Sequence, residues 1–294
     1  MKKLYLQLCL LFVLASCAST NNLNITSKTS LWNLSELSET ELAMANELLA
    51  YGLEHEALYT LLDTLKPMSS MGFPLSYPIA KAGEMKDGDK NVVDLGSDST
   101  QMALKELTKW NNVLESLSNE EFSFHLIPYR FAYQGKRNLQ ILVVKRDKLA
   151  ELLNDKAAFF AQWGFTANAD PATVLTAMEF EERNDRYRAY GYLFGYPEHA
   201  VNFFVEASIS EKETGEFVTR DFFSMPVAVG KTGYFTYATP KGYTPSEVDS
   251  AIYKAAVSTL DQYNSLKPKY SDTDGEVDAV RLISDFWKKT SVYQ

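Results

Sequence analysis

Residues 121–145, EFSFHLIPYRFAYQGKRNLQILVVK, decide the fold class, because here the spacing of apolar residues changes from about four to two. Apolar residues alternate with others along 122–126 and 129–133, on either side of Pro128, and 139–144 form an apolar run. Residues 134–137, QGKR, are suited to the turn between them. The stretch therefore predicts a β-hairpin with an edge or a bulge near Pro128.

The flanking sequence adds helices and a second hairpin. A second region of period two occupies 216–237, and helical spacing of apolar residues predicts helices over 38–66, 101–117, 147–163, 171–188, 198–209, 246–266 and 277–287. Residues 67–100, rich in proline, glycine and serine, predict a long ordered functional loop or a mobile insertion. Because the strands come in hairpins, the sequence predicts an α+β fold, an antiparallel sheet built from hairpins with several packed helices.

Cap residues indicate where two of these helices begin. Ser38 and Glu41 have the spacing of a capping box, and Asp170 precedes Pro171, a cap followed by proline at the first helical position. Gly52 is a weak point at which the first predicted helix can divide.

The first twenty residues, MKKLYLQLCLLFVLASCAST, have the pattern of a secretion signal. Lys2 and Lys3 precede an apolar run over 4–15, which is shorter than the roughly 20 residues that a helix needs to span a bilayer. The run ends in Leu-Ala-Ser-Cys at 14–17. This end resembles the lipobox of bacterial lipoproteins, in which an aliphatic residue and two small residues precede an invariant cysteine.

The resemblance implies that a signal peptide, 1–16, is cleaved before Cys17, whose sulfur receives a diacylglycerol. The amino terminus is then usually acylated as well. Two or three fatty chains, such as palmitate, bury enough CH₂ groups, at about 0.8 kcal/mol each, to hold a protein on a membrane. Ala18, which is not aspartate, resembles the outer-membrane sorting signal of Gram-negative lipoproteins. We therefore expect a lipid-anchored envelope protein at the outer membrane of a Gram-negative bacterium.

Composition limits the partners of the rest of the chain. Residues 17–34 predict a lipidated cysteine with a polar tether, and 35–294 predict one globular α+β domain of one or two lobes. The formal net charge of −9 gives no basic surface for nucleic acid, so the membrane is reached through the lipid alone. With three scattered histidines and no cysteine beyond Cys17, the sequence predicts no disulfide, no metal and no cofactor.

A polar stripe in the first predicted helix is one candidate site. Its members, spaced by four, are Glu47, Tyr51, His55, Tyr59 and Asp63. On a mostly buried helix such a stripe must pair inside the protein or line a wet cavity. In the functional interpretation His55 transfers protons or binds a ligand, with Glu54 or Tyr59 beside it. In the structural interpretation the stripe faces solvent.

The charged stretch 179–188, EFEERNDRYR, is a second candidate. Spacing by four pairs Glu179 with Arg183 and Glu182 with Arg186, which is typical of a solvated helix with weak ion pairs. The functional alternative is that Arg186 and Arg188 bind a carboxylate or a phosphate.

The adjoining turn, YGYLFGYP at 190–197, is dense in glycine and aromatic residues. Gly191 and Gly195 allow close backbone approach, and tyrosines such as Tyr196 offer stacking faces and hydroxyls that suit a sugar or a peptide. The alternative is a packed corner between two helices.

Two functions remain open from the sequence. The first is a non-enzymatic lipoprotein that binds a small molecule or a protein, and the second is an envelope hydrolase that uses carboxylates and His55. The sequence contains no Gly-x-Ser-x-Gly elbow, P-loop or dinucleotide-binding fingerprint. The residues predicted to form a pocket are Tyr51, Glu54, His55, Tyr59, Arg186, Arg188 and Tyr196.

Overall fold

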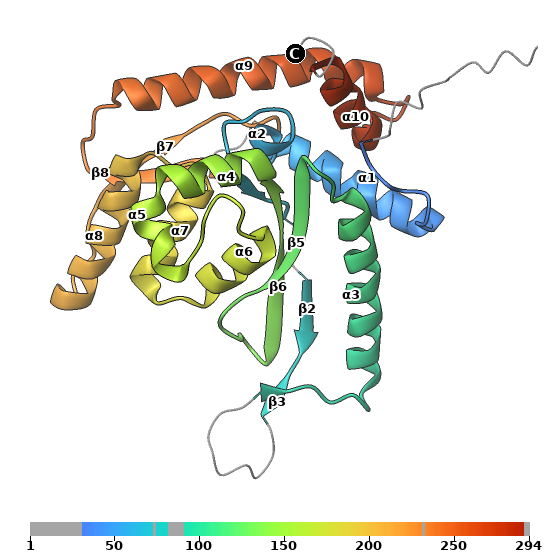
Figure 1. Cartoon of the computed structure of the whole chain (residues 1–294), viewed down its shortest axis with the longest axis horizontal. Helices are drawn as coiled ribbons and strands as arrows, with labels where there is room; N and C mark the ends of the chain where they lie inside the picture. The colour runs from blue at the N-terminus through green and yellow to red at the C-terminus, as the bar shows by residue number, and fades with distance from the viewer. Residues whose placement is uncertain (1–30, 73–74, 82–90, 231–232, 291–294) are drawn as a thin grey trace, which may run out of the picture. The chain divides into compact units, whose positions relative to one another are not determined.

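A four-stranded antiparallel sheet organises the fold, and its longest strand is β6 (Lys136–Lys145). β5 (Phe122–Pro128) pairs with one edge of β6 and forms with it the hairpin predicted over 121–145. The other edge of β6 is shared by β1 (Met68–Ser70) and β2 (Leu75–Pro78). The predicted hairpin is therefore confirmed, and it is part of a larger sheet (Figure 1).

The structure is a computed structural model that describes residues 31–72, 75–81, 91–230 and 233–290. The predicted signal peptide, Cys17 and the tether as far as Ser30 lie outside the described residues. The architecture is α+β, as the sequence predicts, and the described chain belongs to one compact unit. Within the described residues no helix has both the length and the apolar character to cross a membrane.

Helices make up most of the described chain (Figure 1). They are α1 (Glu39–Glu54), α2 (Leu58–Leu61), α3 (Asp98–Leu117), α4 (Arg146–Asp155), α5 (Ala157–Phe160), α6 (Pro171–Phe180), α7 (Arg183–Leu193), α8 (Glu198–Thr214), α9 (Glu247–Tyr270) and α10 (Ala279–Thr290), with a 3₁₀ turn at Ala161–Trp163.

The predicted caps are confirmed. The Ser38 hydroxyl accepts from the backbone N–H of Glu41 (3.4 Å), and the Glu41 carboxylate accepts from the backbone N–H of Ser38 (3.0 Å). Asp170 accepts from the backbone N–H of Thr173 (2.8 Å), and α6 begins at Pro171. Each cap satisfies backbone donors that the first helical turn leaves without a partner.

The prediction of a long loop or an insertion over 67–100 is wrong where the segment forms strands. It contains β1, β2 and a second small ladder, in which β3 (Ala80–Lys81) pairs antiparallel with β4 (Asn91–Val92). Residues 82–90 lie outside the described residues. Strands of two to four residues are too short to show an alternation of period two, so no pattern in the sequence predicts them.

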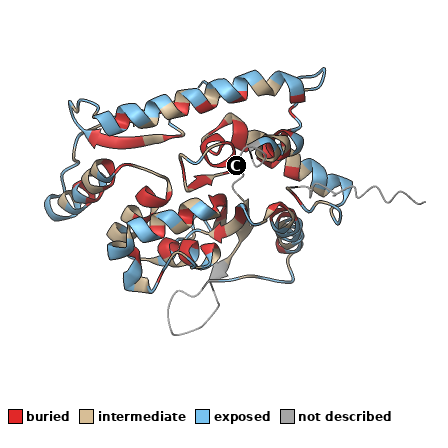
Figure 2. Ribbon diagram, turned by 45° about the horizontal axis from the view of Figure 1, so that its top comes forward, coloured by how far each residue is buried: buried red, intermediate tan, exposed pale blue. Residues whose placement is uncertain are grey.

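The main sheet is buried on both faces. Ile141 and Val143 pack in one hydrophobic cluster with α1, α3 and α10, while Leu142 and Val144 pack in another with α4, α6 and α7. Successive side chains of a strand point to opposite faces, so the apolar run in β6 supplies both clusters. Buried residues accordingly concentrate on the inner sides of the elements (Figure 2).

A second hairpin joins β7 (Arg220–Ser224) to β8 (Thr236–Pro240), as the period-two region over 216–237 predicts. It is separate from the main sheet within the described residues. The long helix α9 lies along it (Figure 1), and the hydroxyl of Tyr237 in β8 donates to Asp249 in α9. This contact fixes the position of the hairpin, which forms one wall of the site described below.

Three predicted helices divide. The one predicted over 147–163 forms α4, α5 and the 3₁₀ turn, and the other two breaks affect the candidate sites. The helix predicted over 38–66 ends as α1 at Glu54, close to the weak point Gly52, and His55 is extended there (φ −118°, ψ −156°). The helix predicted over 171–188 stops at the end of α6, and the chain leaves the helix before α7 begins. Residues spaced by four across either break therefore do not share a face.

Candidate functional site

One face of α7 and its C-cap residue carry three aromatic side chains, Tyr187, Tyr190 and Phe194, whose spacing of three and four places them one above the other. All three line two adjoining cavities, one of about 320 Å³ and one of about 430 Å³. We call this pair of cavities the α7 cleft. Both volumes fall within the range of roughly 300–1,000 Å³ that is usual for small-molecule sites.

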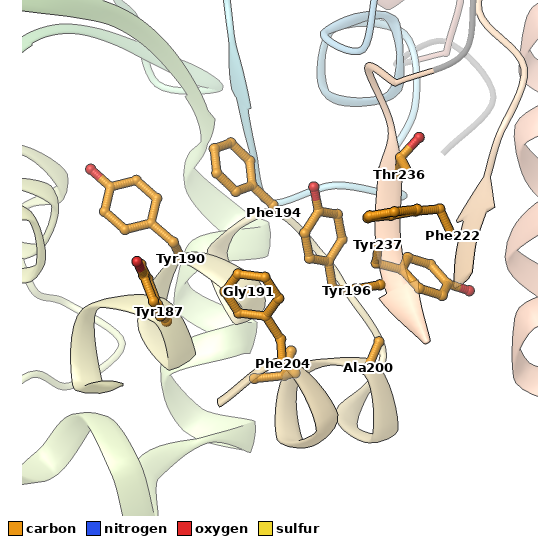
Figure 3. A pocket seen from close by; sticks show the side chains of 12 residues that line it. Tyr187, Tyr190, Gly191, Phe194, Tyr196, Ala200, Phe204, Phe222, Thr236 and Tyr237 are labelled. Carbon is orange, nitrogen blue, oxygen red and sulfur yellow. The ribbon is translucent and has the colours of Figure 1, made fainter. Parts of the chain in front are cut away.

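The first cavity of the α7 cleft lies between α7, the start of α8 and the β7–β8 hairpin, and its walls are largely aromatic (Figure 3). Its aromatic side chains are Tyr187, Tyr190, Phe194, Tyr196, Phe204, Phe222 and Tyr237. Phe222 and Phe204 are 66% and 36% exposed, whereas Tyr237 is buried. Phe222 and Phe204 therefore supply accessible apolar surface at a cavity whose other wall residues are buried or half-buried.

Two glycines near this cavity allow neighbouring segments of the chain to pack closely. A Cβ at Gly191 would lie 2.7 Å from Cγ2 of Val201, so glycine allows α7 and α8 to approach. Gly195 has a φ of +75°, and a Cβ there would lie 3.0 Å from the carbonyl oxygen of Leu65. The predicted close approach is confirmed at both positions. The turn over 190–197 is a packed corner, and Tyr196 within it also lines the cavity.

The second cavity of the α7 cleft is more polar. Glu179, near the end of α6, is only 3% exposed. It accepts hydrogen bonds from the backbone N–H of Arg130 (2.8 Å) and from the hydroxyl of Tyr190 (2.7 Å), which accepts in turn from Gln140 Nε2 (3.0 Å). Burial, with the charge of Glu179, raises the pKa of Tyr190, so its hydroxyl stays protonated and donates.

Arg186 lines the same cavity with a side chain that is 17% exposed. Its Nη1 lies 3.6 Å from Oε1 of Glu179, which is an ion-pair distance and too long for a hydrogen bond. Its Nε is buried and has no hydrogen-bond partner among the described residues. The guanidinium lies over the rings of Phe131 and Tyr187, 5.7 and 5.6 Å from their centroids.

The stretch 179–188 does not form the predicted ladder of ion pairs. That prediction joined Glu179 to Arg183 and Glu182 to Arg186 on one helix. Because the chain leaves the helix after α6, Glu179 is buried against the cleft and faces Arg186, while Glu182 lies 3.3 Å from Arg130. The break contains neither glycine nor proline, so sequence reasoning missed Glu179 as a site residue.

The seven residues predicted to form one pocket separate in the structure. Arg186 and Tyr196 line the α7 cleft. Arg188 is held against α8 instead, because its Nη1 donates to Asn202 Oδ1 and to the hydroxyl of Tyr192 (3.4 Å). The functional alternative, in which Arg186 and Arg188 bind the same carboxylate or phosphate, is therefore wrong, because only Arg186 lines the cleft.

Three of the other predicted residues, Tyr51, Glu54 and His55, line a separate cavity of about 660 Å³, which we call the His55 cavity. Tyr59 does not belong to it, because this side chain is fully buried and its hydroxyl donates to the carbonyl oxygen of Pro226. The predicted polar stripe is thus broken where α1 ends.

The polar groups of the His55 cavity are largely bonded to one another. Glu54 accepts from the hydroxyl of Tyr263 (2.6 Å) and from Lys267 Nζ (2.6 Å). Nδ1 of His55 lies 2.8 Å from the carbonyl oxygen of Tyr51, and the two rings stack at 3.9 Å. Because a carbonyl oxygen only accepts, Nδ1 carries a proton, and Nε2 of the neutral ring is an acceptor.

Comparisons of the chain with protein-family models, with curated proteins and with solved structures found no match. Within the described part of the chain, no group of three or more His, Cys, Asp or Glu side chains is arranged to hold a metal ion. The function is therefore argued from the geometry of the two cavities.

Proposed function

We propose that this protein is a lipid-anchored binding protein of a bacterial envelope, which holds a small molecule with a flat apolar group in the α7 cleft. The observation that carries the proposal is the cavity of about 320 Å³ lined by seven aromatic side chains. Covering apolar surface yields about 25 cal/mol per Å². Phe222 and Phe204 are partly exposed at this cavity, so a ligand has apolar surface to cover.

The distribution of hydrogen bonds favours an apolar ring over a sugar. A sugar needs several polar partners, but the Tyr190 hydroxyl donates to Glu179 and the Tyr237 hydroxyl donates to Asp249. These phenols are already committed to the protein. Aromatic rings, in contrast, gain from stacked or edge-on contacts with other rings.

The anchor in this proposal rests on the lipobox at 14–17. Intact-mass analysis of membrane-extracted protein is expected to show a chain that begins at Cys17 and carries acyl groups. Cys17→Ser protein is expected to leave the membrane fraction. Equal membrane binding of the Cys17→Ser protein would contradict the anchor and would leave the argument for the cleft unchanged.

The binding proposal is tested with naphthalene-2-acetamide, a neutral fluorescent ring compound, titrated into the full chain in phosphatidylcholine nanodiscs with empty nanodiscs as the blank. Phe222→Ala is expected to weaken binding about fivefold, because one ring contact is lost. Phe217→Ala is the matched control, since Phe217 is 70% exposed and lies outside the cleft. Absence of binding, or equal effects of both substitutions, would contradict the proposal.

A hydrolase at the His55 cavity is the second candidate. The observation that favours it is the orientation of His55, whose Nδ1 is held by the Tyr51 carbonyl so that Nε2 can act as a base. The paired state of Glu54 argues against a free second carboxylate beside it. Hydrolysis of p-nitrophenyl esters that is lost in His55→Gln would support the hydrolase, and no hydrolysis above the blank would reject it.

A further inference from the structure

We infer that the α7 cleft selects a ligand that carries one carboxylate group, and that Arg186 binds this carboxylate while the apolar part of the ligand lies among the aromatic walls. This inference rests on the proposed function and names the class of ligand. The observation that supports it is that the Arg186 side chain lines the more polar cavity and has a buried nitrogen without a hydrogen-bond partner in the described residues.

The guanidinium of Arg186 has five N–H donors and makes no hydrogen bond within the described residues. Oε1 of Glu179 lies 3.6 Å from Nη1, at the distance of an ion pair. Burying a donor without a partner costs free energy that a folded protein normally avoids. Because Arg186 also lines a cavity, an acceptor supplied by a ligand can satisfy these donors.

Among the arginines of the described residues, only Arg186 has a buried side-chain nitrogen without a hydrogen-bond partner. Arg188, on the same helix, donates to Asn202 and Tyr192. Arg130 donates to the carbonyl oxygen of Glu181 and to the Glu182 carboxylate. Both side chains are therefore used within the fold, whereas the donors of Arg186 remain available.

The surroundings of Arg186 favour a flat, bidentate acceptor. The rings of Phe131 and Tyr187 lie about the guanidinium, which restricts its movement. A planar guanidinium held in this way presents its N–H edge in the geometry that a carboxylate matches with two parallel hydrogen bonds.

The nearby Glu179 limits the charge of the ligand. Its carboxylate is buried and already offsets part of the Arg186 charge. A dianionic phosphate would place a second negative charge close to Glu179, where repulsion is poorly screened. A monoanionic carboxylate avoids most of that repulsion. The two cavities adjoin at Tyr187, Tyr190 and Phe194, and the inference places the carboxylate in one cavity and the apolar part of the ligand in the other.

The test compares naphthalene-2-acetate with naphthalene-2-acetamide, which has the same shape without the charge, on the full chain in phosphatidylcholine nanodiscs at pH 7. The acetate is expected to bind about tenfold more tightly, the change that 1.4 kcal/mol represents. Arg186→Lys keeps the charge but loses the bidentate fork, so this preference should fall to about twofold. Arg188→Lys is the matched control and should keep the full preference.

A second variant keeps the test valid if Arg186→Lys does not fold. Glu179→Gln combined with Arg186→Met removes both members of the buried ion pair, so no unpaired charge remains. This variant is expected to bind the acetamide and the acetate equally. Equal binding of both probes by the unaltered protein would overturn the inference and leave the proposed function standing. Failure of both probes to bind would instead overturn the proposed function.

Discussion

The α7 cleft and the His55 cavity differ in what their polar groups have left to bind. The His55 cavity, at about 660 Å³, is larger than either single cavity of the α7 cleft, and three of the seven residues predicted to form a pocket line it. Its Glu54 is already bonded to Tyr263 and Lys267. The α7 cleft has accessible aromatic walls, and Arg186 in its wall has no hydrogen bond within the described chain. Unused donors and accessible apolar surface, more than cavity size, mark a binding site.

The largest expected effect concerns the frame of the α7 cleft. Gly195→Ala should lower the free energy of unfolding by about 3 kcal/mol, since alanine disfavours a positive φ and its Cβ would press on the Leu65 carbonyl. Gly215→Ala, at a φ of +74° with open space around it, should cost only about 1 kcal/mol. Urea unfolding of both variants measures the difference, and equal losses would show that the corner is not tightly packed.

A pH-dependent loss of stability is expected on the hairpin side of the cleft. Burial alone would raise the pKa of Asp249, but hydrogen bonds from Tyr237, Tyr243 and Ser246 lower it from 3.8 to about 2. His199 also lies 3.2 Å from this carboxylate. Because the folded pKa is the lower one, the stabilisation is complete above about pH 4 and is lost as the pH falls through 2.

Urea unfolding between pH 5 and pH 2 measures this loss of stability, which amounts to about 2 kcal/mol. Asp249→Asn should be less stable at pH 5 and should lack this part of the acid dependence. An acid dependence that is unchanged in the variant would mean that Asp249 does not hold Tyr237 and the hairpin in place.

The smallest expected effect concerns the His55 cavity. Glu54→Gln should cost about 1 kcal/mol, because the partly exposed ion pair with Lys267 is lost while the Tyr263 hydroxyl keeps an acceptor. Glu47 is an exposed residue of the same cavity, so Glu47→Gln should change stability little. Neither substitution should alter binding of naphthalene-2-acetamide, and a large loss of binding in Glu54→Gln would reverse the assignment of the two cavities.

Local patterns in the sequence predicted much of the fold. The period-two stretch over 121–145 predicted β5 and β6 because alternation within one strand is visible along the chain. Ser38 with Glu41, and Asp170 before Pro171, predicted helix starts because a cap acts within one helical turn. These features depend on neighbours in sequence, which a single chain displays directly.

The site could be predicted only in part, because it depends on breaks and on distant contacts. Arg186 and Tyr196 were identified from their chemistry, and both line the α7 cleft. The sequence predicts a solvated helix at Glu179, because the break after α6 contains no glycine or proline that would indicate it. Phe222 and Tyr237 reach the cleft through packing of the second hairpin against α8 and α9, which no local pattern encodes.

The claim that ligands bind in the α7 cleft is tested most directly by photolabelling of the full chain with 4-benzoylbenzoate, an aromatic carboxylate that cross-links where it binds. Peptide mapping by mass spectrometry is expected to place the label on α7, α8 or the β7–β8 hairpin, with competition by naphthalene-2-acetate. Labelling confined to α1 and α9, around the His55 cavity, would contradict the account.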